Sequence, residues 1–394
     1  MIKPIFVFIR EYHIGLMRGA ITFIDNTLVY FFNKKPKRGP LFINWNLTYR
    51  CNAKCSFCNT HELDRAIPGT ITTEENLRIV REIGESGTWH LSLTGGETLL
   101  VKDLDLIILE AKKYNMFVNV NTNGFLLAKK AKMLVDSGVD SIIISLDSDQ
   151  EEIHDDVRCI PGLTQALMKG IETVKSLRNG KYPKITLRVI VSKQNYKSLD
   201  NLINVFKSKV DKVAFQPIHD GINVPKFLKT DTHSYSTLFH AKNTDPYMFE
   251  AKDQNRFAEV FNALIKKHKW LDTLYYREVE TFLFDKDTLW DKYKCYAGYY
   301  YMTIDPHGRS FPCTFFISGL GNLRERSVMD IWSAEETKKW RKLMKNKENT
   351  CLCWCGIAEV NAFLTNKFEN KLIQNLNKRN KLSNNSKRNL EIPN

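Results

Sequence analysis

The segment Tyr49-Arg50-Cys51-Asn52-Ala53-Lys54-Cys55-Ser56-Phe57-Cys58 follows the first apolar run after residue 40 and is the strongest indication of the fold and its chemistry. Its C-x3-C-x2-C spacing places three thiolates on one short loop, and thiolates are the usual ligands of iron–sulfur clusters. These clusters usually take four protein ligands, so a set of three leaves one iron with an open position. A zinc site is the alternative, but structural zinc sites usually pair two cysteine knuckles.

Outward from this loop, short apolar runs alternate with longer helical patterns. Strands are predicted at residues 41–47, 90–93, 117–121, 141–146, 184–191 and 212–216. Helices are predicted at residues 73–86, 104–114, 128–137, 163–177 and 199–208. This alternation implies parallel strands joined by right-handed crossovers, with the site at the carboxyl ends of the strands. We therefore predict an α/β fold: a partial (β/α)6 TIM-like barrel with a small C-terminal auxiliary cluster domain.

Polar motifs end the next three predicted strands. They are Thr94-Gly95-Gly96-Glu97, Asn121-Thr122-Asn123-Gly124 and Ser145-Leu146-Asp147-Ser148. Together with the cysteine loop and its aromatic residue before the third cysteine, they resemble the radical S-adenosylmethionine (SAM) superfamily. The resemblance implies that Cys51, Cys55 and Cys58 hold a 4Fe–4S cluster. In this family the open iron binds SAM, and an electron from the cluster cleaves SAM to a 5′-deoxyadenosyl radical.

The resemblance also implies the residues that bind SAM. In the family, the Gly-Gly-Glu motif contacts the SAM amino group and the fourth strand reaches the ribose or carboxylate. Arg188 lies within the apolar fifth strand, where a buried charge needs a partner. That partner is either the SAM carboxylate or an internal acidic residue. The expected SAM-binding residues are Gly95, Gly96, Glu97, Asn123, Ser145 and Arg188.

Two departures from the family pattern concern loop geometry. Thr98 stands where the family often has proline after the glutamate. The pattern His154-Asp155-x-x-Arg158, followed by Pro161-Gly162, is common after the fourth strand, but here Cys159 follows the arginine where glycine is usual. Gln216-Pro217 closes the sixth strand and is expected near the adenine or substrate pocket.

A second group of cysteines follows the barrel. Residues 299–304 and 310–314 are predicted to form a hairpin that turns at Gly308 and brings Cys313 beside Cys295. The opening of this region resembles the SPASM/Twitch extension of radical SAM enzymes. Five cysteines suit one auxiliary 4Fe–4S cluster with one to spare, which favours the shorter Twitch-like form, and a zinc site is the alternative. The candidate ligands are Cys295, Cys313, Cys351, Cys353 and Cys355.

Charge and composition limit the possible partners. The 394-residue chain has a net charge of +14. Residues 1–40 and 366–394 carry +5 each, which leaves +4 on the rest of the chain. A groove that follows phosphates would need its charge on the folded body, so we expect no nucleic-acid partner. Cysteine clusters without an evident secretory signal suggest a reducing or anaerobic cytoplasm.

The predicted organisation has five parts: an amphipathic segment at residues 1–40, the barrel at 41–218, a bridging segment at 219–290, the auxiliary domain at 291–365 and a basic tail at 366–394. Charged residues interrupt the first segment too often for a transmembrane span. We favour a helix that packs on the flank of the barrel. The alternative is an interfacial helix followed by the basic patch Lys34-Lys35-Pro36-Lys37-Arg38.

The motifs favour an enzyme that abstracts hydrogen and oxidatively modifies its substrate, with a peptide or protein side chain as the first hypothesis. The alternative substrate is a small biosynthetic intermediate such as a sugar, lipid or cofactor precursor. A remote alternative is a non-catalytic iron–sulfur scaffold. The expected electron donor is a reductant such as ferredoxin or flavodoxin.

Overall fold

A computed structural model describes residues 15–58, 60, 70–219, 245–314, 319–346 and 364–365. The sheet order is β6-β5-β4-β3-β2-β1-β7-β8-β9, and the described strands do not close into a full barrel. Strands β1 to β6 pair in parallel in chain order, at Phe42–Asn46, His90–Thr94, Phe117–Thr122, Ser141–Ser145, Lys184–Val191 and Lys212–Pro217. The predicted strands and the open, partial α/β barrel are confirmed.

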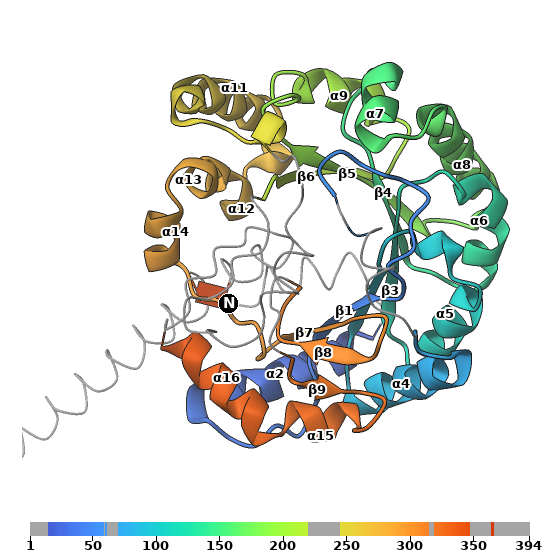
Figure 1. Ribbon diagram of the computed structural model, residues 1–394, viewed down its shortest axis with the longest axis vertical. Coiled ribbons are helices and arrows are strands. Elements are labelled where there is room, and N and C mark those ends of the chain that lie inside the picture. The colour runs from blue at the N-terminus through green and yellow to red at the C-terminus, as the bar shows by residue number, and fades with distance from the viewer. Residues whose placement is uncertain are drawn as a thin grey trace, which may run out of the picture.

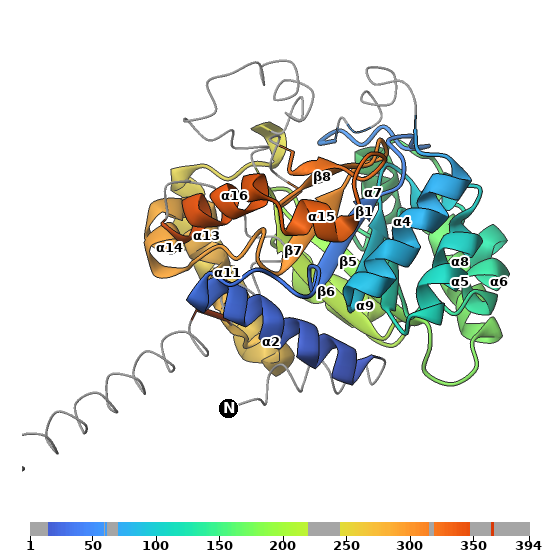
Figure 2. The same cartoon turned by 90° about the horizontal axis from the view of Figure 1, so that it is seen from below.

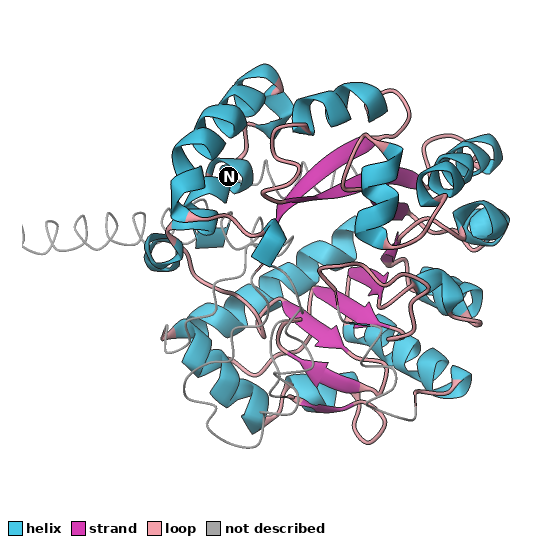
Figure 3. Ribbon diagram, turned by 45° about the horizontal axis from the view of Figure 1, so that its top comes forward, coloured by secondary structure: helices cyan, strands magenta, loops and turns pink. Residues whose placement is uncertain are grey.

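Helices form an outer ring around the strands (Figures 1 and 3). The helices between the parallel strands are α4 (Thr73–Ser86), α5 (Leu104–Lys113), α6 (Leu127–Asp136), α8 (Leu163–Leu177) and α9 (Leu199–Phe206). The five predicted helices are therefore confirmed within two residues at each end. A further helix, α7 (Glu151–Arg158), precedes α8 and was not predicted. Alternate strand residues such as Leu91 and Val118 are fully buried against these helices.

The second half of the chain continues the ring and then returns to the sheet. It contains η2 (Asp245–Tyr247), η3 (Ala251–Asp253), α11 (Gln254–Lys267), η4 (Lys269–Leu271), α12 (Leu274–Arg277), α13 (Val279–Phe284) and α14 (Lys286–Lys292). The predicted hairpin follows as β7 (Tyr301–Ile304) and β8 (Arg309–Phe311), and β9 (Gly321–Asn322) pairs with β8. The last described helices are α15 (Val328–Trp332) and α16 (Glu335–Lys345).

The auxiliary hairpin is continuous with the barrel sheet. Strand β7 pairs in parallel with β1, and Phe42 lies opposite Tyr301. At the turn between β7 and β8, Asp305 accepts a 3.4 Å hydrogen bond from the Tyr49 hydroxyl just before the cysteine loop. A single sheet therefore joins the barrel to the hairpin that carries Cys313. The boundaries predicted for the five parts of the chain stay a prediction.

The concave face of the sheet is arranged in layers. The first residues of four neighbouring strands form one row of rings, in the order Tyr301, Phe42, His90 and Phe117. Two residues further along each strand the row is polar, and it consists of Thr303, Asn44, Ser92 and Asn119. Because side chains alternate between the faces of a strand, both rows point away from the covering helices. Aromatic rings form the floor of the concavity, and amide and hydroxyl groups lie above it.

Helix α2 (Leu16–Phe32) covers the amino-terminal ends of these strands. Figure 2 shows it beneath the sheet. Thr22 donates a 2.7 Å hydrogen bond to the carbonyl of Gly87, and Asn26 donates a 3.0 Å bond to the carbonyl of Gly39. The favoured prediction of a helix packed on the barrel is confirmed, although the helix lies under the strands rather than on their flank. Residues 1–14 and the predicted tail at 366–394 lie outside the described residues.

Candidate active site

The three cysteines of the first group lie in the loop directly after β1. All three are free thiols; Cys55 is buried, and Cys51 and Cys58 are partly buried. Within the loop, the Cys58 N–H donates to the Cys55 carbonyl at 3.1 Å, and the Ala53 N–H points at the Cys51 sulfur at 3.4 Å. The Ser56 N–H donates to the carbonyl of Val157 in α7 at 3.1 Å. The loop is therefore held both internally and from the segment that follows β4.

Gly95 and Gly96 allow the end of β2 to contact the start of this loop. A Cβ atom on Gly96 would lie 2.2 Å from the Arg50 carbonyl oxygen, and one on Gly95 would lie 2.3 Å from that of Thr48. The Gly96 N–H donates to the Thr48 carbonyl at 2.6 Å, and the Glu97 N–H donates to the Arg50 carbonyl at 2.8 Å. Gly95 also has a φ of 148°, which side chains rarely adopt. A side chain at either position would thus collide with the backbone at the start of the cysteine loop, so both positions require glycine.

Glu97 joins the loops after β2 and β3. Its carboxylate has no exposed surface and accepts hydrogen bonds from the Thr122 hydroxyl at 2.7 Å, the Leu99 N–H at 3.0 Å and the Asn123 N–H at 2.8 Å. Burial raises the pKa of Glu97, and these three donors act against that rise. A carboxylate has about four acceptor positions, so one remains. Contact between Glu97 and SAM stays a prediction, and the observed role of this side chain is to position two loops.

Asn123 extends this bracing to the cysteine loop. Its amide donates to the Asn52 side chain at 2.8 Å, while its side-chain oxygen accepts from the Phe125 N–H at 2.9 Å. Both ends of the Asn123 amide are therefore used within the protein. SAM binding by Asn123 stays a prediction as well. The contact that is observed holds Asn52, which lies between Cys51 and Ala53 in the cysteine loop.

Arg158 links the end of β4 to a cysteine thiol. Its Nε donates to Asp147 at 2.6 Å, and a terminal nitrogen lies 3.9 Å from the Cys55 sulfur. The guanidinium also lies over the Phe57 ring, 5.2 Å from its centroid. Burial opposes the charge of Arg158, but Asp147 and the Cys55 thiol more than offset it and raise the pKa. A permanent positive charge is therefore held against one of the three thiols.

The other residues of the motif after β4 have local roles. The His154 ring nitrogen Nδ1 accepts the Asp147 N–H at 3.2 Å, so its hydrogen resides on Nε2 and the ring is neutral. Asp155 caps α8 by accepting the Gly162 and Thr164 N–H groups at 2.7 and 2.8 Å. Cys159 ends α7 with a φ of 52°, in the left-handed region. This conformation explains why glycine suits the position better than cysteine.

The chemistry of the three thiols fits an iron–sulfur cluster. Burial raises the pKa of Cys51 to about 12, and burial also raises the pKa of Cys55 although Arg158 acts against it. Buried thiols of this kind become thiolates only when a strong cation compensates their charge, and iron is such a cation. Among the described residues, no three cysteine, histidine or acidic side chains are grouped to hold a single metal ion.

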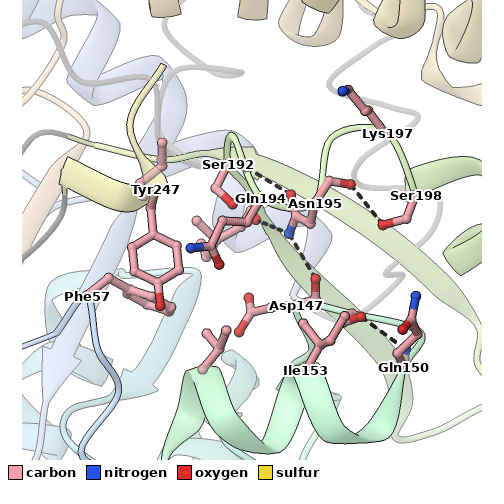
Figure 4. A pocket seen from close by; sticks show the side chains of 14 residues that line it. Phe57, Asp147, Gln150, Ile153, Ser192, Gln194, Asn195, Lys197, Ser198 and Tyr247 are labelled. Carbon is pink, nitrogen blue, oxygen red and sulfur yellow. Dashed lines mark hydrogen bonds between the residues drawn. The ribbon is translucent and has the colours of Figure 1, made fainter. Parts of the chain in front are cut away.

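A pocket lies beside the cysteine loop, at the carboxyl ends of β4, β5 and β6 (Figure 4). Phe57 of the loop, Asp147 after β4 and Ser192 after β5 line it. One Asp147 oxygen, Oδ1, is buried and has no hydrogen-bond partner among the described residues. Asn195 fixes the wall by donating to the Asp147 and Ile190 carbonyls at 2.9 and 2.8 Å. This arrangement suits a ligand with hydroxyl donors, such as a ribose.

Asp147, Arg158, Ser192 and Asn195 were not among the predicted site residues. The first two stand within motifs that the sequence displays, so their positions were visible but their roles were not. Ser192 and Asn195 carry no motif, and only the fold brings them to the pocket. Of the predicted residues, Ser145 lies opposite Arg188 on neighbouring strands. The Arg188 charge reaches His90 across the concave face and contributes to the lowered pKa of that histidine, after burial.

The second cysteine group is described in part. Cys313 is buried at the end of the β7–β8 hairpin and packs in the main core, against which Cys295 also lies. Near Cys313, the Thr314 hydroxyl accepts a 3.3 Å hydrogen bond from Asn44 and lies 3.2 Å from the Thr303 hydroxyl. Cys351, Cys353 and Cys355 lie outside the described residues, so the full ligand set stays a prediction.

The fold and the cysteine loop define a radical SAM enzyme. Residues 45–206 match the family model of the radical SAM superfamily, and residues 295–356 match that of the SPASM iron–sulfur cluster-binding domain. The chain therefore belongs to the radical SAM superfamily and carries a SPASM domain. Its cofactors are a 4Fe–4S cluster with SAM, and auxiliary iron–sulfur chemistry in the SPASM domain. The predicted family and cofactors are confirmed, and the SPASM form of the extension is the one that matches.

Particular relatives cover the chain to different extents. The AdoMet-dependent heme synthase of Methanosarcina barkeri is 26% identical over 81% of this chain and 88% of that protein. The PqqA peptide cyclase of Granulibacter bethesdensis is 31% identical over 42% of this chain and 43% of that protein. Other curated relatives are likewise matched over about half of their length, from 41% to 56%.

Solved structures share the fold. Streptococcus suis SuiB bound to the precursor peptide SuiA has a TM-score of 0.56 and 16% sequence identity. The alignment covers 82% of this chain and 70% of that one. At this level of identity, the similarity supports the fold alone.

Proposed function

We propose that this enzyme abstracts hydrogen from a peptide or protein side chain and oxidatively modifies it. The observation that carries the proposal is the polar row on the concave face, between the aromatic floor and the cysteine loop. There the Asn119 amide donates to the Ser92 hydroxyl at 3.1 Å, and Asn121 donates to the same hydroxyl at 3.1 Å. Amide and hydroxyl groups can also pair with the N–H and C=O groups of a peptide, through the donor and acceptor positions that these contacts leave open.

The polar row also spans both matched domains. Asn44 of β1 bonds to Thr314, one residue after Cys313. A substrate held by this row would lie between the loop of Cys51, Cys55 and Cys58 and the hairpin of the SPASM domain. Two relatives support a peptide by their names, since one is a PqqA peptide cyclase and SuiB was solved with a precursor peptide.

In this proposal Cys51, Cys55 and Cys58 hold the SAM-binding cluster, which supplies the electron for SAM cleavage. Glu97 and Asn123 keep the loop in place, Arg158 holds a positive charge at Cys55, and Asp147 presents its free oxygen to the bound nucleoside. The proposed cofactor-binding residues remain Gly95, Gly96, Glu97, Asn123, Ser145 and Arg188. For the auxiliary cluster we propose four of the five C-terminal cysteines, with Cys295 and Cys313 among them.

A small biosynthetic intermediate is the second candidate substrate. It is favoured by a relative whose match covers 81% of this chain, the AdoMet-dependent heme synthase. Arg188 on the concave face would suit a substrate carboxylate. For either substrate we propose a low-potential donor such as ferredoxin or flavodoxin, and a reducing or anaerobic cytoplasm as the working compartment.

The deciding experiment uses protein purified anaerobically with its iron and sulfide restored. With dithionite and SAM, we expect 5′-deoxyadenosine; none from protein with intact clusters would refute the enzyme proposal. A short peptide encoded by the neighbouring reading frame is then added, and its mass is measured. Loss of hydrogen mass from the peptide supports the first candidate, and an unchanged peptide beside active SAM cleavage supports the second.

Two variants locate the substrate and the role of the second cysteine group. Asn44→Leu should preserve SAM cleavage and lower peptide modification at least about tenfold, because it leaves polar groups unpaired. Asn204→Leu, an exposed change on α9, is the matched control and should leave both reactions unchanged. Cys313→Ala should spare SAM cleavage and block the product; equal loss of both would mean that the second cysteine group is only structural.

A further inference from the structure

Helix α2 has an unusual distribution of side chains. Of its five buried residues, Gly19, Thr22 and Asn26 are small or polar, whereas Val29 and Tyr30 near its end are large and hydrophobic. Gly19 packs against the Trp89 ring, where an added Cβ would lie 3.0 Å from the nearest ring atom. The two polar side chains are bonded to backbone carbonyls of the segments that precede β1 and β2. The buried side of α2 is therefore mixed, and hydrogen bonds hold the helix to the strands as well as hydrophobic packing.

The outward face is apolar. Met17, Ile21, Ile24 and Phe32 are 78%, 46%, 57% and 66% exposed. Their spacing of four, three and eight residues places them in one stripe along the helix. Eleven large hydrophobic side chains of the described residues are exposed, and four of them are in this one helix. Scattered single side chains are common on protein surfaces, but a continuous stripe marks an interaction site.

The charged residues of α2 do not interrupt this stripe. Arg18 turns inward and donates to the Thr88 carbonyl at 2.9 Å. Asp25, the single acidic residue of the helix, accepts the Lys37 and Arg38 N–H groups at 3.0 and 2.9 Å. The two charged residues within α2, Arg18 and Asp25, therefore both bond to the protein. They leave the outward face uncharged.

Positive charge follows directly at one end of the stripe. Lys34, Lys35 and Lys37 are exposed after the helix ends at Phe32. The Lys34 ammonium lies 5.9 Å from the centroid of the Phe32 ring, so charge and stripe are adjacent. An apolar helix face with lysines at its border complements an anionic lipid surface, where acyl chains and acidic headgroups meet.

We propose that α2 binds the enzyme reversibly to the surface of an anionic lipid bilayer. Met17, Ile21, Ile24 and Phe32 enter the boundary between headgroups and acyl chains, and the lysines contact the headgroups. No described helix is long and apolar enough to cross a bilayer. The helix covers the amino-terminal ends of the strands, so the cysteine loop faces away from the bilayer (Figure 2).

The test is co-sedimentation of the full-length holoenzyme with vesicles, under anaerobic conditions. Vesicles of phosphatidylcholine mixed with phosphatidylglycerol should pellet most of the protein, and pure phosphatidylcholine should pellet much less. The triple variant Met17→Ser, Ile21→Ser, Ile24→Ser should lower the partition coefficient at least about tenfold. Lys34→Gln with Lys35→Gln should lower binding to the anionic vesicles alone.

The matched control is Leu106→Ser with Leu109→Ser, two side chains on α5 that are 44% and 45% exposed. It should bind vesicles as the wild type does, and all variants should keep SAM cleavage. If the triple variant does not fold, Met17→Ser alone decides, because Met17 is the most exposed of the four. Wild-type protein that stays in the supernatant would overturn the proposal. So would equal loss of binding in the control, or a stripe variant that only converts a dimer to a monomer.

Discussion

The two ends of the parallel strands are built from different residues and follow different rules. At the carboxyl ends, buried polar groups such as Glu97, Asp147 and Arg158 hold loops against one another by hydrogen bonds. At the amino ends, aromatic rings pack together, with the Phe42 and Tyr301 rings stacked at 5.3 Å and Trp89 against Phe42 at 5.8 Å. Position is thus fixed by hydrogen bonds between buried polar groups at one end, and by packed rings together with hydrogen bonds from α2 at the other.

This difference indicates where the molecule tolerates change. A polar network fails when one partner is left unpaired, so damage there should affect the chemistry before the fold. An aromatic cluster loses packing energy when a ring is removed, so damage there should affect stability before the chemistry.

The largest expected effect is at the carboxyl ends. Cys51→Ala should reduce 5′-deoxyadenosine formation to background, because the cluster loses one of its three protein thiolates. The melting temperature of the cluster-free protein should change little, since Cys51 is only partly buried. A variant that still formed the nucleoside with wild-type iron content would contradict the assignment of Cys51.

The converse change is at the amino ends. Trp89→Ala removes a buried ring that contacts Phe42, Phe117 and the helix α2, and should destabilise the protein by about 3–5 kcal/mol. Denaturant unfolding measures the loss. The folded fraction should retain SAM cleavage per cluster. Equal loss of specific activity would show that the two ends are not independent.

Acidification should act through His154, which is fully buried. Burial lowers its pKa from 6.5 to about 4 in the folded state. Below pH 6.5 the unfolded chain binds the proton first, so stability is lost as pH falls from about 6.5 to about 4, by about 3 kcal/mol in total. His154→Gln should flatten unfolding free energy against pH in that window, and an unchanged slope would assign the effect to other groups.

Variants of Arg158 test whether the polar network sets the reduction potential of the cluster as well as the position of the cysteine loop. Arg158→Gln removes the positive charge at Cys55, which should lower the reduction potential of the cluster and slow SAM cleavage by about 10–100-fold. Arg158→Lys should restore part of the potential. Electron paramagnetic resonance during a redox titration measures both variants, and an unchanged potential in Arg158→Gln would limit the residue to a structural role.

The smallest effect is expected at Cys159. The left-handed conformation costs a cysteine about 1–2 kcal/mol, and glycine would relieve this strain. Glycine also makes the unfolded chain more flexible, which offsets about 0.5–1 kcal/mol of the relief. Cys159→Gly should therefore stabilise the protein by up to about 1 kcal/mol in denaturant unfolding. SAM cleavage should be unchanged, and destabilisation would show that the 3.4 Å hydrogen bond from the Cys159 thiol to the Asp156 carbonyl outweighs the backbone strain.

Much of the fold could be predicted because its strands and helices have strong local patterns. The cysteine loop and the Gly-Gly-Glu motif pointed to the correct end of the sheet. The pairing of β7 with β1 could not be predicted, because no local pattern says which edge a distant strand joins. The role of Glu97 was also hidden, since its three donors come from segments that only the fold assembles.

The role of α2 shows a different limit. Hydrophobic periodicity suggests which face of a helix is apolar, and the apolar face is normally the buried one. In α2 large hydrophobic side chains lie on both sides, with Val29 and Tyr30 buried in the aromatic cluster. The helix is also held by hydrogen bonds from Arg18, Thr22 and Asn26 to carbonyl groups near the starts of β1 and β2. Such partners are invisible in the sequence.

The pairing of β1 with β7 has a consequence for how the protein is made. The edge of the sheet formed by β1 stays uncovered until β7 has been synthesised, because Phe42 lies opposite Tyr301. At roughly 5–20 residues per second, a ribosome takes roughly 13–50 s to add the intervening chain. During that interval the nascent barrel exposes the edge of β1, directly before the loop with Cys51, Cys55 and Cys58. An exposed edge invites pairing with other chains, so a chaperone or early cluster insertion would give newly made protein its greatest benefit at this stage.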